Sequence, residues 1–155
     1  MDTNKIKSDF QLLKTSVVSL DIKNNFVEYD EHESGTKTID IAYKIIDDRT
    51  IEPQKIHGGS VDLHITVASK IGENVYIIKM IFRGFFSAPI SMEHSTFSRM
   101  LVVNGTASLY TMARAVLLSI SSLMFTGGSI LLPMVNMTRF HEYSDSAAVE
   151  KNETE

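Results

Sequence analysis

The chain has 155 residues, a formal net charge of −4 and no cysteine. This length fits one domain with a single core. The acidic balance argues against a general nucleic-acid-binding protein, and the missing thiols exclude a disulfide framework and a thiolate metal site. The first ten residues are polar and lack the apolar segment of a secretory signal, so we expect a cytoplasmic protein.

Four segments alternate apolar and polar residues with the period of a half-buried β-strand. They are Leu12–Ile22, Thr38–Ile46, Ser60–Ser69 and Asn74–Ser87. The last is apolar on both faces, so we expect it at the centre of a sheet with cover on each side. The polar segments Asn24–Lys37 and Asp47–Gly59 predict surface loops. This part of the chain therefore predicts a four-stranded antiparallel sheet.

A long helix is predicted after the fourth strand. Asn104-Gly105-Thr106 offers a turn and an N-cap. From Thr106 to about Phe125 the chain has no glycine or proline, and Gly127-Gly128 then supplies a stop. These signals predict a helix of about five turns.

A short connector and a second helix are expected to follow. Pro133 lies in the connector, and Asn136 or Thr138 is placed to cap a helix from residue 139 to about residue 150. The fold class is therefore α+β: a four-stranded antiparallel sheet, a long helix and a second C-terminal helix. We expect a flexible N-terminus over residues 1–9, a domain over 10–143, and the end of the second helix with a polar tail over 144–155.

The stretch from Ala115 to Thr138 contains no charged residue. A membrane span is one explanation, but serines, glycines and a proline interrupt the stretch, and Arg114 sits within the helix, where lipid would make it costly. A core helix is the second explanation, with a buried stripe of Leu109, Met112, Val116, Ile120 and Leu123.

The other face of this helix carries small side chains at helical spacing. They are Ser108, Thr111, Ala115, Ser119 and Ser122. A helix without charge on its outer face is most simply covered there too. We therefore predict no membrane span and an obligate oligomer with this stripe at the subunit interface; cover by the second helix is the alternative.

No pattern in the chain indicates an enzyme. The five histidines are His32, His57, His64, His94 and His141, and their spacing does not match a metal site. Nucleophile, phosphate-binding and dinucleotide-binding motifs are missing as well. We expect no catalytic residues, no metal and no cofactor. Eight methionines lie mostly in apolar segments, where they serve either as core residues or as an adaptable binding surface.

Three short segments, in their order and spacing, resemble SecB, the bacterial protein-export chaperone. They are Arg83-Gly84-Phe85-Phe86-Ser87, Leu109-Tyr110-Thr111-Met112-Ala113-Arg114 and Leu132-Pro133-Met134-Val135-Asn136-Met137. The resemblance covers about Phe10 to Tyr143. It implies a SecB-like fold, an ATP-independent holdase that binds unfolded chains, and a homotetramer built as a dimer of dimers through the long helix.

The resemblance also implies a client groove and a docking face for the translocase ATPase SecA. For the groove we expect Tyr76, Ile78, Met80 and Phe82 with Leu131, Leu132 and Met134, although the strand residues fit a core equally well. SecA docks through acids on the sheet. Here Lys79 and Val17 replace two of them and only Asp21 keeps a carboxylate, which removes complementarity. An alternative is therefore a module dedicated to one partner, such as an antitoxin.

Overall fold

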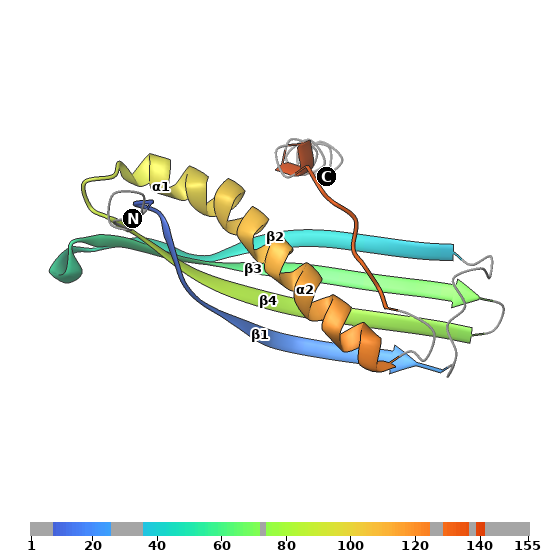
Figure 1. The fold of residues 1–155 in the computed structure, drawn as a ribbon. Helices are drawn as coiled ribbons and strands as arrows, with labels where there is room; N and C mark the ends of the chain where they lie inside the picture. Colours follow the sequence, from blue (N-terminus) through green and yellow to red (C-terminus); the bar gives the residue numbers. More distant parts are fainter. Residues whose placement is uncertain (1–7, 26–35, 72–73, 125–128, 137–138, 142–155) are drawn as a thin grey trace, which may run out of the picture.

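The computed structural model describes residues 8–25, 36–71, 74–124, 129–136 and 139–141. Four strands form one antiparallel sheet in the order β1-β4-β3-β2 (Figure 1). They are β1 (Gln11–Asn24), β2 (Thr36–Ile51), β3 (Ile56–Ile71) and β4 (Asn74–Pro89). β4 lies between β1 and β3, which confirms the central position that its two apolar faces predict.

The hairpin of β2 and β3 is longer than its sequence indicates. The prediction of a loop over Asp47–Gly59 is wrong, because β2 runs to Ile51 and β3 begins at Ile56. A 3-10 turn over Glu52–Gln54 reverses the chain, and Lys55 then adopts a left-handed conformation with φ 52°. One compact turn therefore replaces the predicted loop.

Glycines inside the strands admit the helix rather than make turns. A Cβ at Gly59 would lie 2.6 Å from Leu101 Cδ2, and one at Gly84 would lie 2.5 Å from Leu109 Cδ2. Both distances are shorter than van der Waals contact. The sheet backbone thus approaches the helix at two points where a side chain would push the layers apart.

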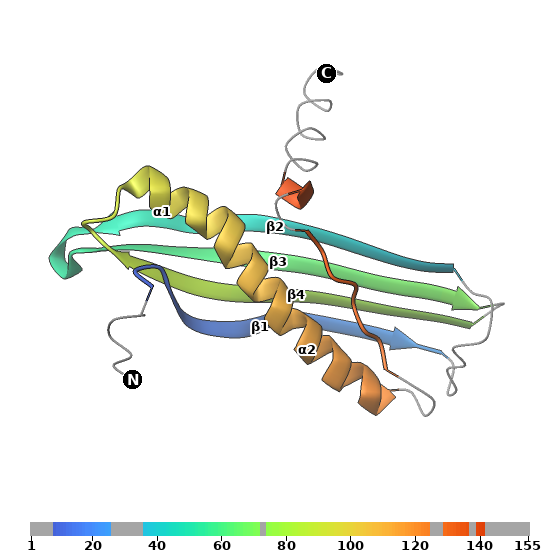
Figure 2. The ribbon, with the colours of Figure 1, turned by 45° about the horizontal axis from the view of Figure 1, so that its top comes forward.

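One face of the sheet carries the hydrophobic core. Its fully buried side chains alternate along β3 and β4: Val61, Leu63, Ile65, Val67, Tyr76, Ile78, Met80 and Phe82. The helix and the extended connector of residues 129–136 both lie across this face (Figures 1 and 2). Ile130 and Leu132 of the connector belong to the same buried cluster. No described helix or strand lies over the opposite face.

A single helical segment runs from His94 to Met124. It consists of α1 (His94–Met100), a π-helical turn (Leu101–Gly105) and α2 (Thr106–Met124). The predicted helix from Thr106 to about Phe125 corresponds to α2, but the turn and N-cap predicted at Asn104–Thr106 are wrong, because the helix continues through these residues from the π-helical turn. The Thr106 hydroxyl donates to the Val102 carbonyl there, so its side chain bonds within the helix instead of capping it.

Every fourth residue of this helix is buried against the sheet. These residues are Phe97, Leu101, Gly105, Leu109, Ala113, Leu117 and Ser121. A repeat of four exceeds the roughly 3.6 residues of an α-helical turn, and the wider π-helical turn takes up part of the difference. The predicted core stripe is correct at Leu109 but wrong at Met112 and Leu123, which are 39% and 89% exposed.

By length and hydropathy, the helix from His94 to Met124 is able to cross a membrane. A helix that buries one face on a sheet of its own chain passes the same test. Leu109 and Leu117 are buried in the same cluster as β-strand residues, so one face of this helix packs on the sheet of its own chain.

The predicted second helix is described only over residues 139–141, which are helical. Asn136 Oδ1 accepts a hydrogen bond from the Arg139 backbone N–H at 3.2 Å, so Asn136 acts as the predicted cap. The rest of that helix, the Gly127-Gly128 stop, Thr138 and both chain ends lie outside the described residues.

Candidate functional site

The strand residues predicted to line an open groove lie in the core instead. Tyr76, Ile78, Met80 and Phe82 are between 0% and 4% exposed. Their side chains point to the face that the helix and the connector cover, so in this structure they offer no surface to a ligand. The prediction of an open groove is wrong for these four residues, and the alternative that they form the core is correct.

The three connector residues that were predicted to line the same groove differ in their exposure. Leu132 is fully buried, whereas Leu131 is 58% and Met134 83% exposed. An extended chain points successive side chains in opposite directions, which explains the difference between the two leucines. Leu131 and Met134 are therefore available to a ligand, and Leu132 belongs to the core.

Side chains of α2 hold the connector through its backbone. The Ser121 hydroxyl accepts from the Ile130 N–H at 2.7 Å. Arg114 Nε donates to the Leu132 carbonyl at 2.9 Å, and the Tyr110 hydroxyl donates to the Pro133 carbonyl at 2.8 Å. The sequence did not predict these roles. The signal available in it was the charged Arg114 and the phenol of Tyr110 within an otherwise apolar helix.

Tyr110 gives this contact a pH dependence. Burial raises the pKa of its phenol above the ordinary value of 10.0, and the nearby Arg114 charge opposes this by less. The folded protein therefore keeps the proton to higher pH than the unfolded chain does. Stability that is fully present below pH 10.0 is lost as the pH rises through the folded-state pKa.

We expect the urea midpoint of the wild type to fall more steeply above pH 10.0 than that of Tyr110→Phe. Below that pH the variant should lose only one hydrogen bond, about 0.5–1.5 kcal/mol. Urea titrations across this pH range compare the two proteins. Parallel curves for both would contradict the assignment.

The small stripe of α2 faces outward. Ser108, Thr111, Ala115, Ser119 and Ser122 are all exposed. The hydroxyls bond to carbonyls of the preceding helical turn, for example Ser119 Oγ to the Ala115 carbonyl at 3.0 Å and Ser122 Oγ to the Ser119 carbonyl at 2.7 Å. Hydroxyls satisfied in this way are buried at little cost. The stripe is thus suited to a close, dry contact, and its role as an interface stays a prediction.

Exposed apolar side chains lie beside this stripe on α2. Met112 and Leu118 are 39% and 38% exposed, and Leu123 is 89% exposed. Contiguous apolar surface on a folded chain usually marks an association site. The outer face of α2 therefore combines small and apolar groups, with no charged residue among its exposed positions.

A second apolar surface follows the edge strand β1. Its exposed side chains are Leu13, Val17, Val18, Leu20 and Ile22, with exposures of 62%, 41%, 48%, 40% and 36%. Within the part of the chain that the structure describes, β1 pairs with β4 alone, so its other edge presents unpaired backbone groups. The sequence shows these residues as an ordinary half-buried strand, and only the strand order reveals the free edge.

Two histidines fasten the start of the helix to the β2–β3 hairpin. His57 is 3% exposed; its Nε2 lies 2.8 Å from the Met92 carbonyl and its Nδ1 2.9 Å from Thr50 Oγ1. Nε2 must donate to the Met92 carbonyl, because a carbonyl oxygen only accepts. His94 Nε2 lies 3.1 Å from Asp48 Oδ1. Both rings are engaged in structural contacts.

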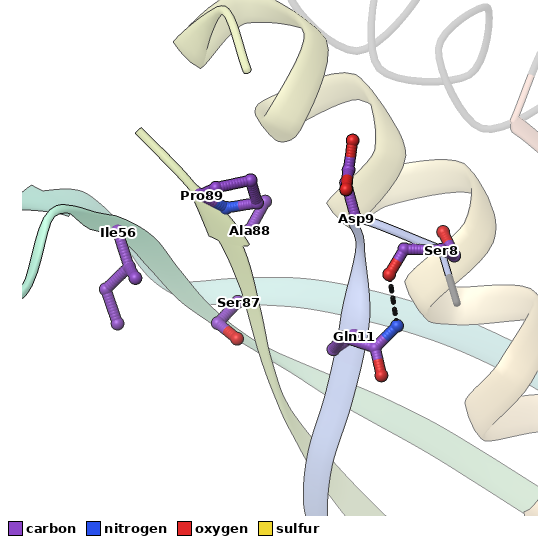
Figure 3. A pocket seen from close by; sticks show the side chains of 7 residues that line it. All are labelled: Ser8, Asp9, Gln11, Ile56, Ser87, Ala88 and Pro89. Atoms are coloured by element: carbon purple, nitrogen blue, oxygen red, sulfur yellow. Dashed lines mark hydrogen bonds between the residues drawn. The ribbon is translucent and has the colours of Figure 1, made fainter. Parts of the chain in front are cut away.

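A cavity of about 320 Å³ lies where β1 enters the sheet beside the end of β4 (Figure 3). Its lining residues are Ser8, Asp9, Gln11, Ile56, Ser87, Ala88 and Pro89. The Gln11 amide donates to the Ser8 carbonyl and is thereby occupied. The described lining residues include no histidine, lysine or arginine, so they do not assemble an acid–base pair of the usual kind.

Comparisons with known proteins identify the fold. No model of a known protein family and no functionally curated protein matches the sequence. Among solved structures, a SecB-like chaperone of Mycobacterium tuberculosis, in complex with a ChAD peptide from the HigA1 antitoxin, superposes with a TM-score of 0.63 at 11% identity. The match covers 81% of this chain and 90% of that one. The chain has the SecB-like fold.

A protein of unknown function from Streptococcus agalactiae is similar as well. It has a TM-score of 0.52 at 14% identity, and the match covers 81% of this chain and 97% of that one. The expectation of a SecB-like α+β fold, drawn from three short motifs, is therefore confirmed.

On the uncovered face of this SecB-like sheet, charges alternate in sign. Asp21 of β1 lies opposite Lys79 of β4, which continues the row to Thr66 and Asp40. Lys79 therefore offsets the carboxylate that the resemblance assigned to SecA docking. Val17 lies opposite Phe82, on the helix-covered side, so it does not belong to this charged row.

One ion pair on the same face is partly withdrawn from solvent. Arg83 Nε and Nη2 donate to the two Asp62 carboxylate oxygens at 2.5 and 2.7 Å. The hydrogen bond to Asp62 raises the pKa of Arg83 above its ordinary value. The pair is bidentate, which fixes two central strands in register.

Proposed function

We propose that this chain is a non-enzymatic, ATP-independent chaperone that binds unfolded polypeptide segments and keeps them from aggregating. The observation that carries the proposal is the SecB-like fold, since a similar chain has been solved with a peptide bound. The exposed Leu131 and Met134 of the connector support it, because burial of client side chains against such groups is favourable by about 25 cal/mol per Å².

The proposed assembly is a dimer of dimers. A tetramer of this kind needs two different self-complementary surfaces. The chain offers two candidates on separate elements: the small stripe on the outer face of α2 and the free edge of β1. Packing of this α2 face against another subunit would also explain why the helix carries no charge there, without a membrane span.

The proposal also covers the kind of organism, the compartment and the partner of the protein. We propose a bacterial, cytoplasmic protein with a role in protein export. Coupling to SecA is the least supported part, because Lys79 stands opposite Asp21 on the sheet face where acids would be required. A module dedicated to one partner, such as an antitoxin, is the second candidate, and the peptide in the similar structure favours it.

An aggregation assay separates these functions. We expect the purified protein to suppress light scattering of two unrelated denatured clients at near-stoichiometric ratio without nucleotide. Leu131→Ser with Met134→Ser should weaken the protection. The matched control is Ile90→Ser, because Ile90 is an exposed apolar residue (38%) at the other end of the sheet. Protection of neither client would refute the holdase, and protection of a single cognate partner would favour the dedicated module.

A further inference from the structure

The connector of residues 129–136 is held in an unusual way for a segment that completes a core. Among the described residues, the backbone of 129–135 makes no hydrogen bond to another backbone group. Three α2 side chains bind its backbone, namely Tyr110, Arg114 and Ser121. These backbone contacts reach one N–H and two carbonyls, so they do not depend on which residues the connector carries. One further contact does, because Arg114 Nη1 also donates to Met134 Sδ at 2.9 Å.

The two fully buried side chains of the connector are alternate ones, and Val135 packs against the same core while partly buried. Ile130 is 1% exposed and Leu132 0%, and both join the cluster that contains Tyr76 and Ile78. The intervening Leu131 points to solvent. An extended chain with apolar residues two positions apart satisfies the same contacts, as in other sites that recognise peptides through their backbone.

The path of the connector explains why the predicted groove is closed. It crosses the helix-covered face of the sheet beside α2 (Figure 2), above the strands that carry Tyr76, Ile78 and Met80. The connector thus fills the place on the sheet where the sequence predicts the groove.

We infer that residues 129–136 act as a built-in ligand, and that the same site accepts an extended polypeptide segment with apolar side chains at positions i and i+2 when the connector is displaced. This inference rests on the proposed function and names its ligand class and its regulation. Tyr110, Arg114 and Ser121 are the residues that bind the incoming backbone. Occupation by the connector lowers the apparent affinity to the intrinsic affinity multiplied by the fraction of molecules in which the connector is displaced.

The first test uses a fluorescent free peptide with the sequence of residues 129–136 as the probe. Leu132→Ala weakens the built-in ligand and is expected to bind the probe about tenfold more tightly than the wild type does. Leu131→Ala, one residue away and outward-facing, should not tighten binding. A probe with serine at the positions of Ile130 and Leu132 should not bind. Equal or weaker binding by Leu132→Ala would overturn the inference.

The second test compares one protein with itself, with the connector locked or released. The chain has no cysteine, and Ser121 Oγ lies 2.7 Å from the Ile130 nitrogen, so S121C with I130C places two cysteines on adjoining segments. The oxidised protein should bind the probe at least about tenfold more weakly than the same protein after reduction. Failure of the disulfide to form, or equal binding in both forms, would contradict the closed connector as the occupant.

The aggregation assay keeps the two proposals distinguishable. If the oxidised S121C/I130C protein still protects both clients fully, the holdase stands and the connector site is refuted. If the probe binds as expected but no client is protected, the peptide site stands and the holdase is refuted.

Discussion

Phe86→Ala is expected to lower the free energy of unfolding by about 3–5 kcal/mol, because it empties the contact between sheet and helix. Phe86 is 2% exposed. Its ring stacks on Phe10 with centroids 5.2 Å apart. It also lies 2.9 Å and 3.3 Å from where Cβ atoms at Gly84 and Gly105 would stand, so backbone from two layers closes around it.

The neighbouring Phe85 provides a matched control on the other face of β4. It is only partly buried, and Lys14 Nζ lies 4.5 Å from its ring centroid. A cation–π contact at such a site is worth about 0.5–1 kcal/mol. Urea unfolding followed by circular dichroism measures both variants. Equal losses for Phe85→Ala and Phe86→Ala would show that the helix does not cover this face.

Ser119→Glu combined with Ser122→Glu is expected to break the assembly. Both serines are exposed and face away from the sheet, so the folded subunit accommodates the charges. At a subunit interface the same carboxylates would be desolvated without partners, which costs several kcal/mol per group. Light scattering after size exclusion should report a smaller particle with unchanged circular dichroism.

Ser95→Glu is the control for this change, since Ser95 is an exposed serine of the same helical segment outside the stripe. It should keep the wild-type mass. A double variant that also keeps the wild-type mass would exclude the outer face of α2 as the interface and leave the β1 edge as the candidate.

The strands were predictable because their signal is local. Alternation along Ser60–Ser69 and Asn74–Ser87 identifies both strands, and the apolar character of the second predicts its central place. The ends were not predictable, because Gly58 and Gly59 have the composition of a turn. Gly59 instead admits Leu101 from a helix some forty residues later, and a Cβ at Gly58 would meet Ile51 of the paired strand, so the requirement at Gly59 is non-local.

The residues of the site were predictable from the sequence, but whether the groove they form is open or closed was not. Tyr76, Ile78 and Leu132 share a cluster, as a groove of strand and connector residues requires. Whether such a groove is open depends on what lies over it, and an apolar strand face has the same pattern in both cases. The free edge of β1 was not predicted for a related reason: the alternation within one strand does not reveal the order of the strands in the sheet.

The π-helical turn at Leu101–Gly105 determines which side of α2 faces the sheet. Removing one residue there would turn the following helix by about 100° relative to the sheet. Arg114 would then move into the fully buried place of Ala113, and its hold on the connector carbonyl would be lost. One wide turn therefore decides which side of α2 closes the core, which side holds the connector and which side is left for another molecule.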